Sequence, residues 1–441
     1  MNQTQARGDF VDAALDRWLV PFLAAFKREA QCKWAPIYLR GLIGGGDRKS
    51  VEPIALRVAP GETQQLHHFI STSPWATEPL EKVLAQEADR LIGGDDAFLI
   101  VDDTAVVKKG EHSVGVAHQY CGELGKKANC QALVSLTLAR NEIPIPVALR
   151  LYLPESWTED RERCDRARVP SSIVFRTKHQ IALEEIDRLR ACGVRFSQVL
   201  ADAGYGSAAE FRQGLTKRGI AWTVGITSSH NVYPADVKVT MPENQGTGRP
   251  PKHPVTDVAP SSAEKFIRKL GKDSFTRIAW RYGTKGTLSG DFAFVRVRVA
   301  DGREARSGVH LPGPEVWLIC ERRSNELKYY LSSHGRTTSR RKLVTFIKSR
   351  WACEQGHQQM KEELGLDHLE CRSWVALHHH AIMTMMAFAF LQTMRLQEKK
   401  RFPTGAADVA VSSAYPAPHH RQDAAMRSMS RLCAACAHSG A

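Results

Sequence analysis

An apolar run at residues 97–101 leads directly into two aspartates, Asp102 and Asp103. A short strand without polar alternation is typical of the centre of a sheet that is covered on both faces. The segment 197–202 is a second short strand that ends in a carboxylate, Asp202. Open α/β sheets place their ligands at such strand ends. The sequence therefore predicts an α/β core with acidic side chains at the ends of its strands.

The residues between these two strands complete the predicted core. Apolar residues predict strands at 131–139 and 144–153, which are close enough along the chain to form a hairpin. Residues 177–192 have the composition and period of a helix. The predicted order is therefore strand, strand, strand, helix, strand.

The residue patterns change on both sides of this core. Helical periods occur in the N-terminal part, at 9–30, 50–58 and 76–92, whereas polar and apolar residues alternate from 222 to 335. We therefore expect a helical domain at 1–94, a first part of the core at 95–221 and a β-rich insertion at 222–335. C-terminal core helices should follow at 336–398 and a disordered tail at 399–441.

The C-terminal part of the core is predicted to contain two helices. The first spans 338–364 and ends at Gly365, and the second is the very apolar segment 378–396. Within the preceding insertion, the alternation at 291–300 places Arg296 and Arg298 on one face of a strand.

The charge balance favours a polyanionic partner. The 441 residues contain 61 Lys and Arg against 47 Asp and Glu, a net charge of +14. Such an excess is typical of proteins that bind nucleic acid, although a basic enzyme without such a partner is the alternative. We found no run of about 18 apolar residues and no signal peptide, and the scattered cysteines do not suggest a disulfide framework. These features predict a cytoplasmic bacterial protein that does not enter a membrane.

Carboxylates at these positions suit a two-metal nuclease. Asp102 or Asp103, with Asp202 and Glu354, supply the oxygen ligands that Mg²⁺ prefers, and two such ions clamp the attacking and leaving oxygens of a phosphodiester. If residues 338–364 form one helix, steps of about 100° per residue place Glu354 on the same stripe as the apolar Leu343. A salt bridge between Arg350 and Glu354 is the structural alternative.

The spacing Arg350-x₃-Glu354-x₆-Lys361 is similar to the R-E-K part of the Y-x₂-R-x₃-E-x₆-K signature of DDE insertion-sequence transposases. The tyrosine position of that signature is Ile347 in this chain. Further segments resemble the insertion-sequence group 701 of that superfamily, at 100–126, 150–160, 199–206 and 378–392. The resemblance extends over roughly residues 36–395.

This resemblance implies an RNase H-like catalytic core with a β-rich insertion and an N-terminal helical domain. It implies that Asp103, Asp202 and Glu354 are the catalytic, metal-binding acids, with two Mg²⁺ (or Mn²⁺) ions per site. Asp102 remains open as an alternative to Asp103. Arg350 and Lys361 are expected to hold DNA phosphates. Further DNA contacts are predicted after the first acid and in the insertion, at Lys108, Lys109, Arg296 and Arg298.

The function implied is that of a DNA transposase, which cleaves at transposon ends and joins the 3′-OH ends to target DNA. Its partners would be double-stranded DNA and a second copy of the chain on paired ends, at the nucleoid. One alternative is an RNase H-like nuclease or resolvase without strand transfer. Another is an inactive DNA-binding repressor, which would have no use for the acidic trio.

Overall fold

The computed structural model describes residues 3–243, 252–283, 286–306, 309–324 and 326–401. The predicted tail, apart from its first residues, and most of the loop at 244–254 lie outside these residues. The chain forms two compact units, 1–196 with 351–441 and 197–350, each of which is treated separately below.

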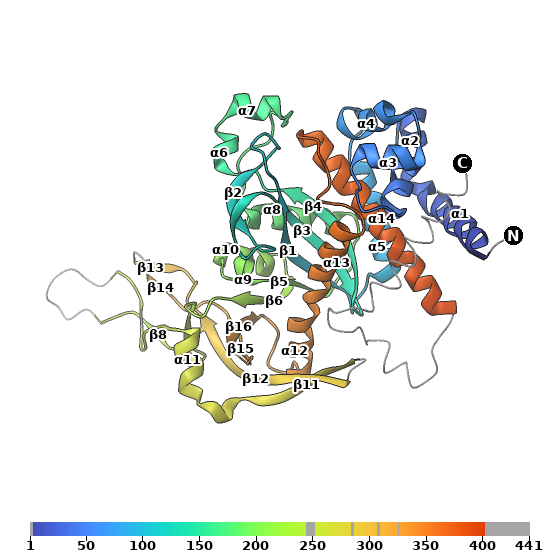
Figure 1. Cartoon of the computed structure of the whole chain (residues 1–441). Helices are drawn as coiled ribbons and strands as arrows, with labels where there is room; N and C mark the ends of the chain where they lie inside the picture. The colour runs from blue at the N-terminus through green and yellow to red at the C-terminus, as the bar shows by residue number, and fades with distance from the viewer. Residues whose placement is uncertain (1–2, 244–251, 284–285, 307–308, 325, 402–441) are drawn as a thin grey trace. The chain divides into compact units, whose positions relative to one another are not determined.

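Five helices form the N-terminal part of the first unit (Figure 1). They are α1 (Gln3–Leu23), α2 (Glu29–Ile43), α3 (Val51–Val58), α4 (Thr63–Ser71) and α5 (Glu78–Ile92). The predicted helices at 50–58 and 76–92 correspond to α3 and α5. The single helix predicted at 9–30 was wrong at its C-terminal end, because α1 ends at Leu23 and α2 begins at Glu29. Helix α2 could have been found, since its buried Trp34, Tyr38 and Leu42 have the helical period.

The sheet of the first unit is built around a long central strand. It contains β1 (Phe98–Val107), β2 (Ala117–Cys121), β3 (Lys126–Arg140) and β4 (Ile143–Leu151). Strand β3 pairs antiparallel with β1 on one side, and with β2 and then β4 on the other. The predicted hairpin is confirmed: β3 and β4 are joined by Asn141 and Glu142, both with positive φ, as a tight two-residue turn requires. Strand β2 was not predicted.

Helices cover both faces of this sheet. Helix α8 (Lys178–Ala191) contacts β3, whereas α13 (Trp351–Glu362) contacts β1, β3 and β4. The long helix α14 (Trp374–Arg401) packs against β4 and the N-terminal helices. By length and composition α14 could cross a membrane, but 89% of its most apolar window is buried in the protein, as in a core helix. Two short helices, α6 (Glu155–Thr158) and α7 (Arg161–Arg166), connect β4 to α8.

The second unit begins with the strand that was predicted at 197–202. Strand β5 (Gln198–Ala201) pairs in parallel with β6 (Ala221–Ile226), and the sheet continues antiparallel in the order β6-β16-β15-β12-β7-β10, with β11 also on β12. Those strands are β7 (Asn231–Pro234), β10 (Ser261–Ser262), β11 (Thr276–Gly283), β12 (Gly286–Val299), β15 (Glu315–Arg322) and β16 (Leu327–Ser332). The β-rich character expected at 222–335 is confirmed.

The second unit also contains two small two-stranded sheets and several helices. The small sheets are β8 (Val239–Thr240) with β9 (Val255–Thr256), and β13 (Glu304–Arg306) with β14 (Val309–His310). The helices are α9 (Ala203–Gly206), α10 (Ala209–Lys217), α11 (Ala263–Leu270), the 3₁₀ turn at Lys272–Ser274, and α12 (Arg340–Ser349).

The single helix predicted at 338–364 was wrong. Helix α12 ends at Ser349 and α13 begins at Trp351, and the two helices belong to different compact units. The buried face of α13 includes Cys353 and His357, whereas Glu354 is exposed. At about 100° per residue, Glu354 lies about 100° away from Cys353. The expectation that Glu354 shares an apolar stripe with Leu343 therefore fails, because it assumed one uninterrupted helix.

Candidate active site

Asp102 and Asp103 of β1 point to opposite faces of the first unit's sheet, because successive residues of a strand alternate. Asp102 lies opposite Ser135 of β3, and its Oδ1 accepts a hydrogen bond of 2.9 Å from the Asp103 backbone N–H. Asp103 lies opposite Val134 and meets the N-terminus of α8. The two neighbouring acids therefore belong to different surroundings.

The Asp103 carboxylate binds the ammonium group of Lys178, with Nζ 2.5 Å from Oδ2. Lys178 is the first residue of α8, and the start of that helix is fixed by a capping box in which Thr177 and Gln180 bond each other's backbone N–H groups. Both side chains of the pair are about one-third exposed. The Asp103 side chain thus already faces a cation.

Glu354 lies near the N-terminal end of α13, and its side chain is exposed. Helix α13 contacts β1 in the same unit, but Asp102 faces α13, whereas Asp103 points to the opposite face of the sheet, toward α8.

Asp202 belongs to the second unit, where it follows β5 and caps α9. Its Oδ1 accepts a hydrogen bond of 3.1 Å from the Tyr205 N–H. The turn that carries Asp202 packs closely on β6: a Cβ on Gly206 would overlap the carbonyl oxygen of Gly225. Glycine is required here because the two backbones approach each other directly. The structure therefore brings two of the three predicted acids into one unit and fixes the third locally in the other.

The lysines predicted to bind DNA have different surroundings in the first unit. Lys108 is half-buried, its Nζ donates to the Leu369 carbonyl oxygen at 2.7 Å, and burial lowers the pKa of its ammonium. Lys109 is exposed. Lys361 forms an ion pair of 2.6 Å with Glu123, and only 13% of its side chain is exposed.

The arginines predicted to bind DNA lie in the second unit. Arg350 is half-buried at the end of α12. Arg296 and Arg298 share one strand face as predicted, but the structure engages both: Arg296 bonds Glu315 and the His334 carbonyl oxygen, and Arg298 bonds the Gly313 carbonyl oxygen. Their role toward DNA stays a prediction, and their first role is to tie β12 to neighbouring segments.

Sequence reasoning missed a polar cluster beneath Glu354. Cys353 and His357 of α13 point toward the sheet, where one ligand atom of each lies within 4.8 Å of a carboxylate oxygen of Asp102. The signal was present in the sequence, since a Cys-x₃-His spacing puts both side chains on one face of a helix.

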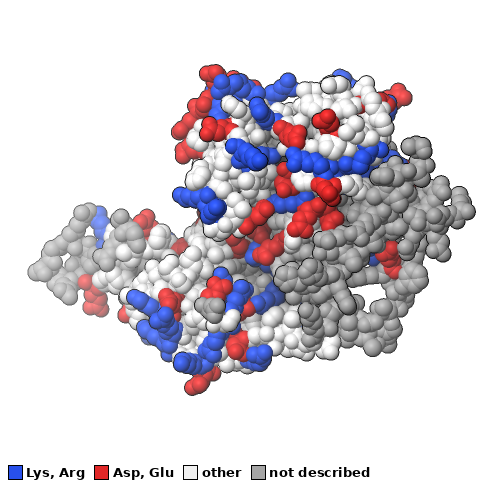
Figure 2. All heavy atoms as spheres, in the orientation of Figure 1, with Lys and Arg blue, Asp and Glu red and all other residues white. Residues whose placement is uncertain are grey.

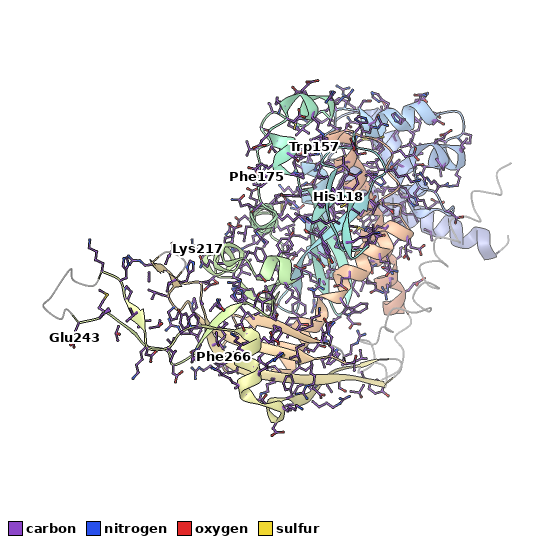
Figure 3. The ribbon with its side chains drawn as sticks, turned by 60° about the vertical axis from the view of Figure 1, so that its left-hand side comes forward. His118, Trp157, Phe175, Lys217, Glu243 and Phe266 are labelled. Atoms are coloured by element: carbon purple, nitrogen blue, oxygen red, sulfur yellow. The ribbon has the colours of Figure 1, made fainter. Side chains whose placement is uncertain are left out.

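A second missed feature is a basic pocket in the first unit, with a volume of about 560 Å³. The guanidinium of Arg163 stacks on the Trp157 ring at 3.8 Å; Trp157 is labelled in Figure 3. The basic residues that line the pocket come from α4, the β1–β2 loop, the α7 region and the segment before α14. They are His67, His112, Arg163, Arg166, Arg168 and Arg372. On the face shown in Figure 2, Lys and Arg side chains are interspersed with Asp and Glu.

Two comparisons with known proteins agree with this arrangement. A family model described as DDE superfamily endonuclease matches residues 21–287. Over 193 residues the chain is 33% identical to a "Probable transposase for insertion sequence element IS701" from Microchaete diplosiphon. That alignment covers 44% of this chain and 48% of the relative, about half the length of each. Because the family model spans more than half of the chain and the described fold is mixed α/β with helices on a mixed sheet, this protein belongs to the DDE superfamily endonucleases, whose catalytic core is RNase H-like.

Proposed function

We propose that this endonuclease is a transposase, which cuts DNA at the ends of an insertion sequence and joins the freed 3′-OH ends to target DNA. The observation that carries the proposal is the match to the DDE superfamily endonuclease model over residues 21–287, in a chain that has Asp103 on β1 and Glu354 on α13. Asp202, at the end of β5, is the third acid of the proposed site.

The donor groups fit a hard divalent cation. Asp103, Asp202 and Glu354 offer carboxylate oxygens, the ligands that Mg²⁺ or Mn²⁺ takes in proteins. The Asp103 carboxylate is paired with the Lys178 ammonium, which a metal ion at this position would have to displace. In the proposed enzyme two bound Mg²⁺ ions would stabilise the charge on the attacking and leaving oxygens.

Both proposed reactions are in-line displacements at phosphorus, so one set of carboxylates can serve both. In the first, water attacks the phosphodiester at the element end and the 3′ oxygen leaves as a hydroxyl. In the second, that 3′-OH attacks a target phosphodiester, forms a new P–O bond and displaces the target's 3′ oxygen. Lys361 and Arg350 would neutralise DNA phosphates beside the cut.

We further propose that the protein acts as a homodimer on paired double-stranded ends, at the nucleoid of a bacterial cytoplasm, and that residues 1–94 contact the element ends. Basic residues of that part are already engaged within the chain. Arg40 bonds Asp12 and Asp16, and Arg48 bonds Glu370, so end binding would have to use other donors or exchange these pairs.

The test is a strand-transfer assay with the full chain, duplexes of the flanking element ends that carry a free 3′-OH, and target DNA. The wild type should give joined products with Mg²⁺. Glu354→Gln, Asp103→Asn and Asp202→Asn should each lower cleavage by more than about a hundredfold while DNA binding survives. Glu362→Gln, on the same helix and exposed, is the matched control and should stay active.

Other outcomes of this assay separate the alternatives. Cleavage without joined products would make the protein a nuclease or resolvase. Binding without cleavage by the wild type would make it a repressor derived from a transposase. Loss of activity in Asp102→Asn but not in Asp103→Asn would move the first metal-binding acid to Asp102.

A further inference from the structure

The cluster of Asp102, Cys353 and His357 has the donor set of a transition-metal site. Cys353 and His357 lie one turn apart on α13, and both are buried against the sheet. The Cys353 Sγ is 3.5 Å from the His357 Nε2. An oxygen of Asp102 on β1 completes a group whose members lie within 4.8 Å of one another.

The distance between sulfur and nitrogen matches tetrahedral coordination. With Zn–S near 2.3 Å and Zn–N near 2.0–2.1 Å, a tetrahedral angle separates the two ligand atoms by about 3.5–3.6 Å. The observed separation of Cys353 Sγ and His357 Nε2 is 3.5 Å. An oxygen of Asp102 lies within 4.8 Å of both atoms, and the partial exposure of Asp102 leaves it room to approach an ion.

The surroundings suit a ligand set rather than an apolar core. Ser135 Oγ lies 2.7 Å from His357 Nε2, and Thr137 Oγ1 lies 3.3 Å from Cys353 Sγ. Both hydroxyls come from the β3 face next to Asp102, and the Ser135 hydroxyl, which contacts the Nε2 atom that an ion would bind, can then bond a metal-bound water instead.

We propose that Asp102, Cys353 and His357 form a binding site for a borderline transition-metal ion of the Zn²⁺ class, with water as fourth ligand. A thiolate and an imidazole select such an ion over Mg²⁺, which takes oxygen ligands. The site shares no residue with the proposed catalytic trio, and Asp103 points to the opposite face of the sheet. The ion would link β1 to α13, the elements that carry Asp103 and Glu354.

Metal binding at this site releases a proton. The Cys353 thiol gives up its proton to solvent as the sulfur–metal bond forms, and His357 binds as the neutral imidazole. Affinity should therefore rise with pH. No oxidant or other reactant is needed.

The test uses the full chain, freed of metal by a chelator and titrated with Co²⁺, a spectroscopic substitute for Zn²⁺. Tetrahedral coordination with a thiolate should give visible d–d bands and a sulfur-to-cobalt charge-transfer band that saturates at one ion per chain. Added Zn²⁺ should bleach both. Cys353→Ser should abolish the charge-transfer band, and His357→Gln and Asp102→Asn should weaken binding by about ten- to a hundredfold.

Control variants separate this site from other thiols and from the catalytic acids. Cys320→Ser removes a buried cysteine of the second unit, and Cys433→Ser with Cys436→Ser removes the C-x-x-C pair of the tail. Both controls, and Glu354→Gln, should keep the full cobalt spectrum. Circular dichroism checks that each variant is folded.

A wild-type chain without the cobalt bands, or a folded Cys353→Ser chain that keeps them, would overturn the proposal and leave a hydrogen-bonded core cluster. The measurement needs no DNA, so it does not depend on the transposase assay. A chain inactive in strand transfer can still bind cobalt, and an active one can fail to.

Discussion

Lys178 Nζ lies 2.5 Å from Asp103 Oδ2, so the predicted first catalytic acid is paired with the first residue of helix α8. Both side chains are about one-third exposed, and pairs of this kind contribute only about 0–1 kcal/mol to stability. The pair matters more for binding, because a metal ion at Asp103 has to displace or repel the ammonium group.

We therefore expect Lys178→Met to lower the Mg²⁺ concentration needed for half-maximal DNA cleavage by about fivefold. Removing one unit of positive charge a few ångströms from the ion is worth about 1 kcal/mol at a partly exposed site. The measurement is cleavage rate against Mg²⁺ concentration. Lys217→Met, an exposed lysine of α10 labelled in Figure 3, should leave the curve unchanged. A variant that needs more Mg²⁺ would mean that Lys178 helps to hold the substrate instead.

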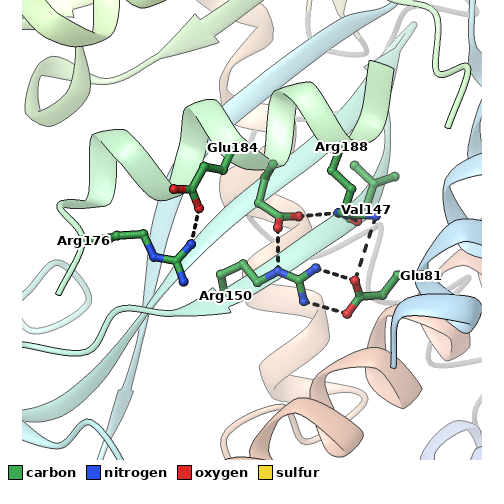
Figure 4. A network of polar contacts seen from close by, with 7 residues as sticks. Glu81, Val147, Arg150, Arg176, Glu184 and Arg188 are labelled. Atoms are coloured by element: carbon green, nitrogen blue, oxygen red, sulfur yellow. Dashed lines mark hydrogen bonds and ion pairs between the residues drawn. The ribbon is translucent and has the colours of Figure 1, made fainter. Parts of the chain in front are cut away.

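Arg150 of β4 joins α5 and α8 through a buried ionic network, shown in Figure 4. It bonds Glu81 of α5 and Glu185 of α8, and only 3% of the Glu81 side chain is exposed. Arg150→Met should lower the free energy of unfolding by about 3–5 kcal/mol, because it removes the guanidinium that bonds both carboxylates and leaves the buried Glu81 with a longer contact of 3.9 Å to Arg188. The nearby pair of Arg176 and Glu184 is more exposed, so Arg176→Met should cost at most about 1 kcal/mol. Urea unfolding of both variants compares the two; equal losses would contradict the prediction.

The same network predicts an acid-dependent loss of stability. Burial acts to raise the pKa of Glu81, but hydrogen bonds and charge from Arg150 outweigh it and lower that pKa to about 2, from 4.5 for the free group. The unfolded chain therefore takes up this proton at a higher pH than the folded chain. The contribution is complete above pH 4.5 and is lost as pH falls from 4.5 toward 2. Unfolding measured across this range should show a shallower fall in Glu81→Gln than in the wild type.

The buried His380 of α14 predicts a second loss of stability, at a less acidic pH. Its Nε2 lies 2.9 Å from the Gly365 carbonyl oxygen and its Nδ1 2.9 Å from the Tyr38 hydroxyl, which fits a neutral ring that donates to the first and accepts from the second. Burial lowers the pKa of His380 to about 4, from 6.5. Stability should therefore decline as pH falls from 6.5 to 4, since the unfolded chain is protonated first. His380→Gln should flatten this decline, whereas the exposed His68→Gln should not.

The turn that carries Asp202 depends on Gly206. A Cβ at this position would meet the Gly225 carbonyl oxygen and come within 2.6 Å of Val224 Cβ. Gly206→Ala should therefore lower the free energy of unfolding by about 1–3 kcal/mol and reduce cleavage by displacing Asp202. Gly335→Ala is the control in the same unit, because nothing lies within 4 Å of its added Cβ. Differential scanning calorimetry measures the change in the free energy of unfolding. A Gly206→Ala chain as stable and active as the control would refute this account.

Features that depend on local periodicity and turn chemistry could be predicted from the sequence alone. The apolar run before Asp102, the hairpin at Asn141 and Glu142, helix α8 and the alternation of β12 were all predicted from neighbouring residues. Such patterns still hold in the folded protein, because the period of a strand or helix is set by the residues of that element alone. The family resemblance, carried by short motifs, likewise needed no structure and is confirmed by the family model.

Which side chains contact one another, in contrast, depends on how the elements pack. Helices α12 and α13 are separate around Arg350, and Glu354 is exposed. Asp102 faces Cys353 and His357, whereas Asp103 forms an ion pair with Lys178. Arg296 forms an ion pair with Glu315, a residue of the neighbouring strand. These contacts join residues tens to hundreds of positions apart, and a charged side chain keeps the same local signal whether it finds a partner in the fold or remains in solvent. For that reason periodicity could not reveal that one helix ends at Ser349 and another begins at Trp351, nor which of two adjacent aspartates meets which helix.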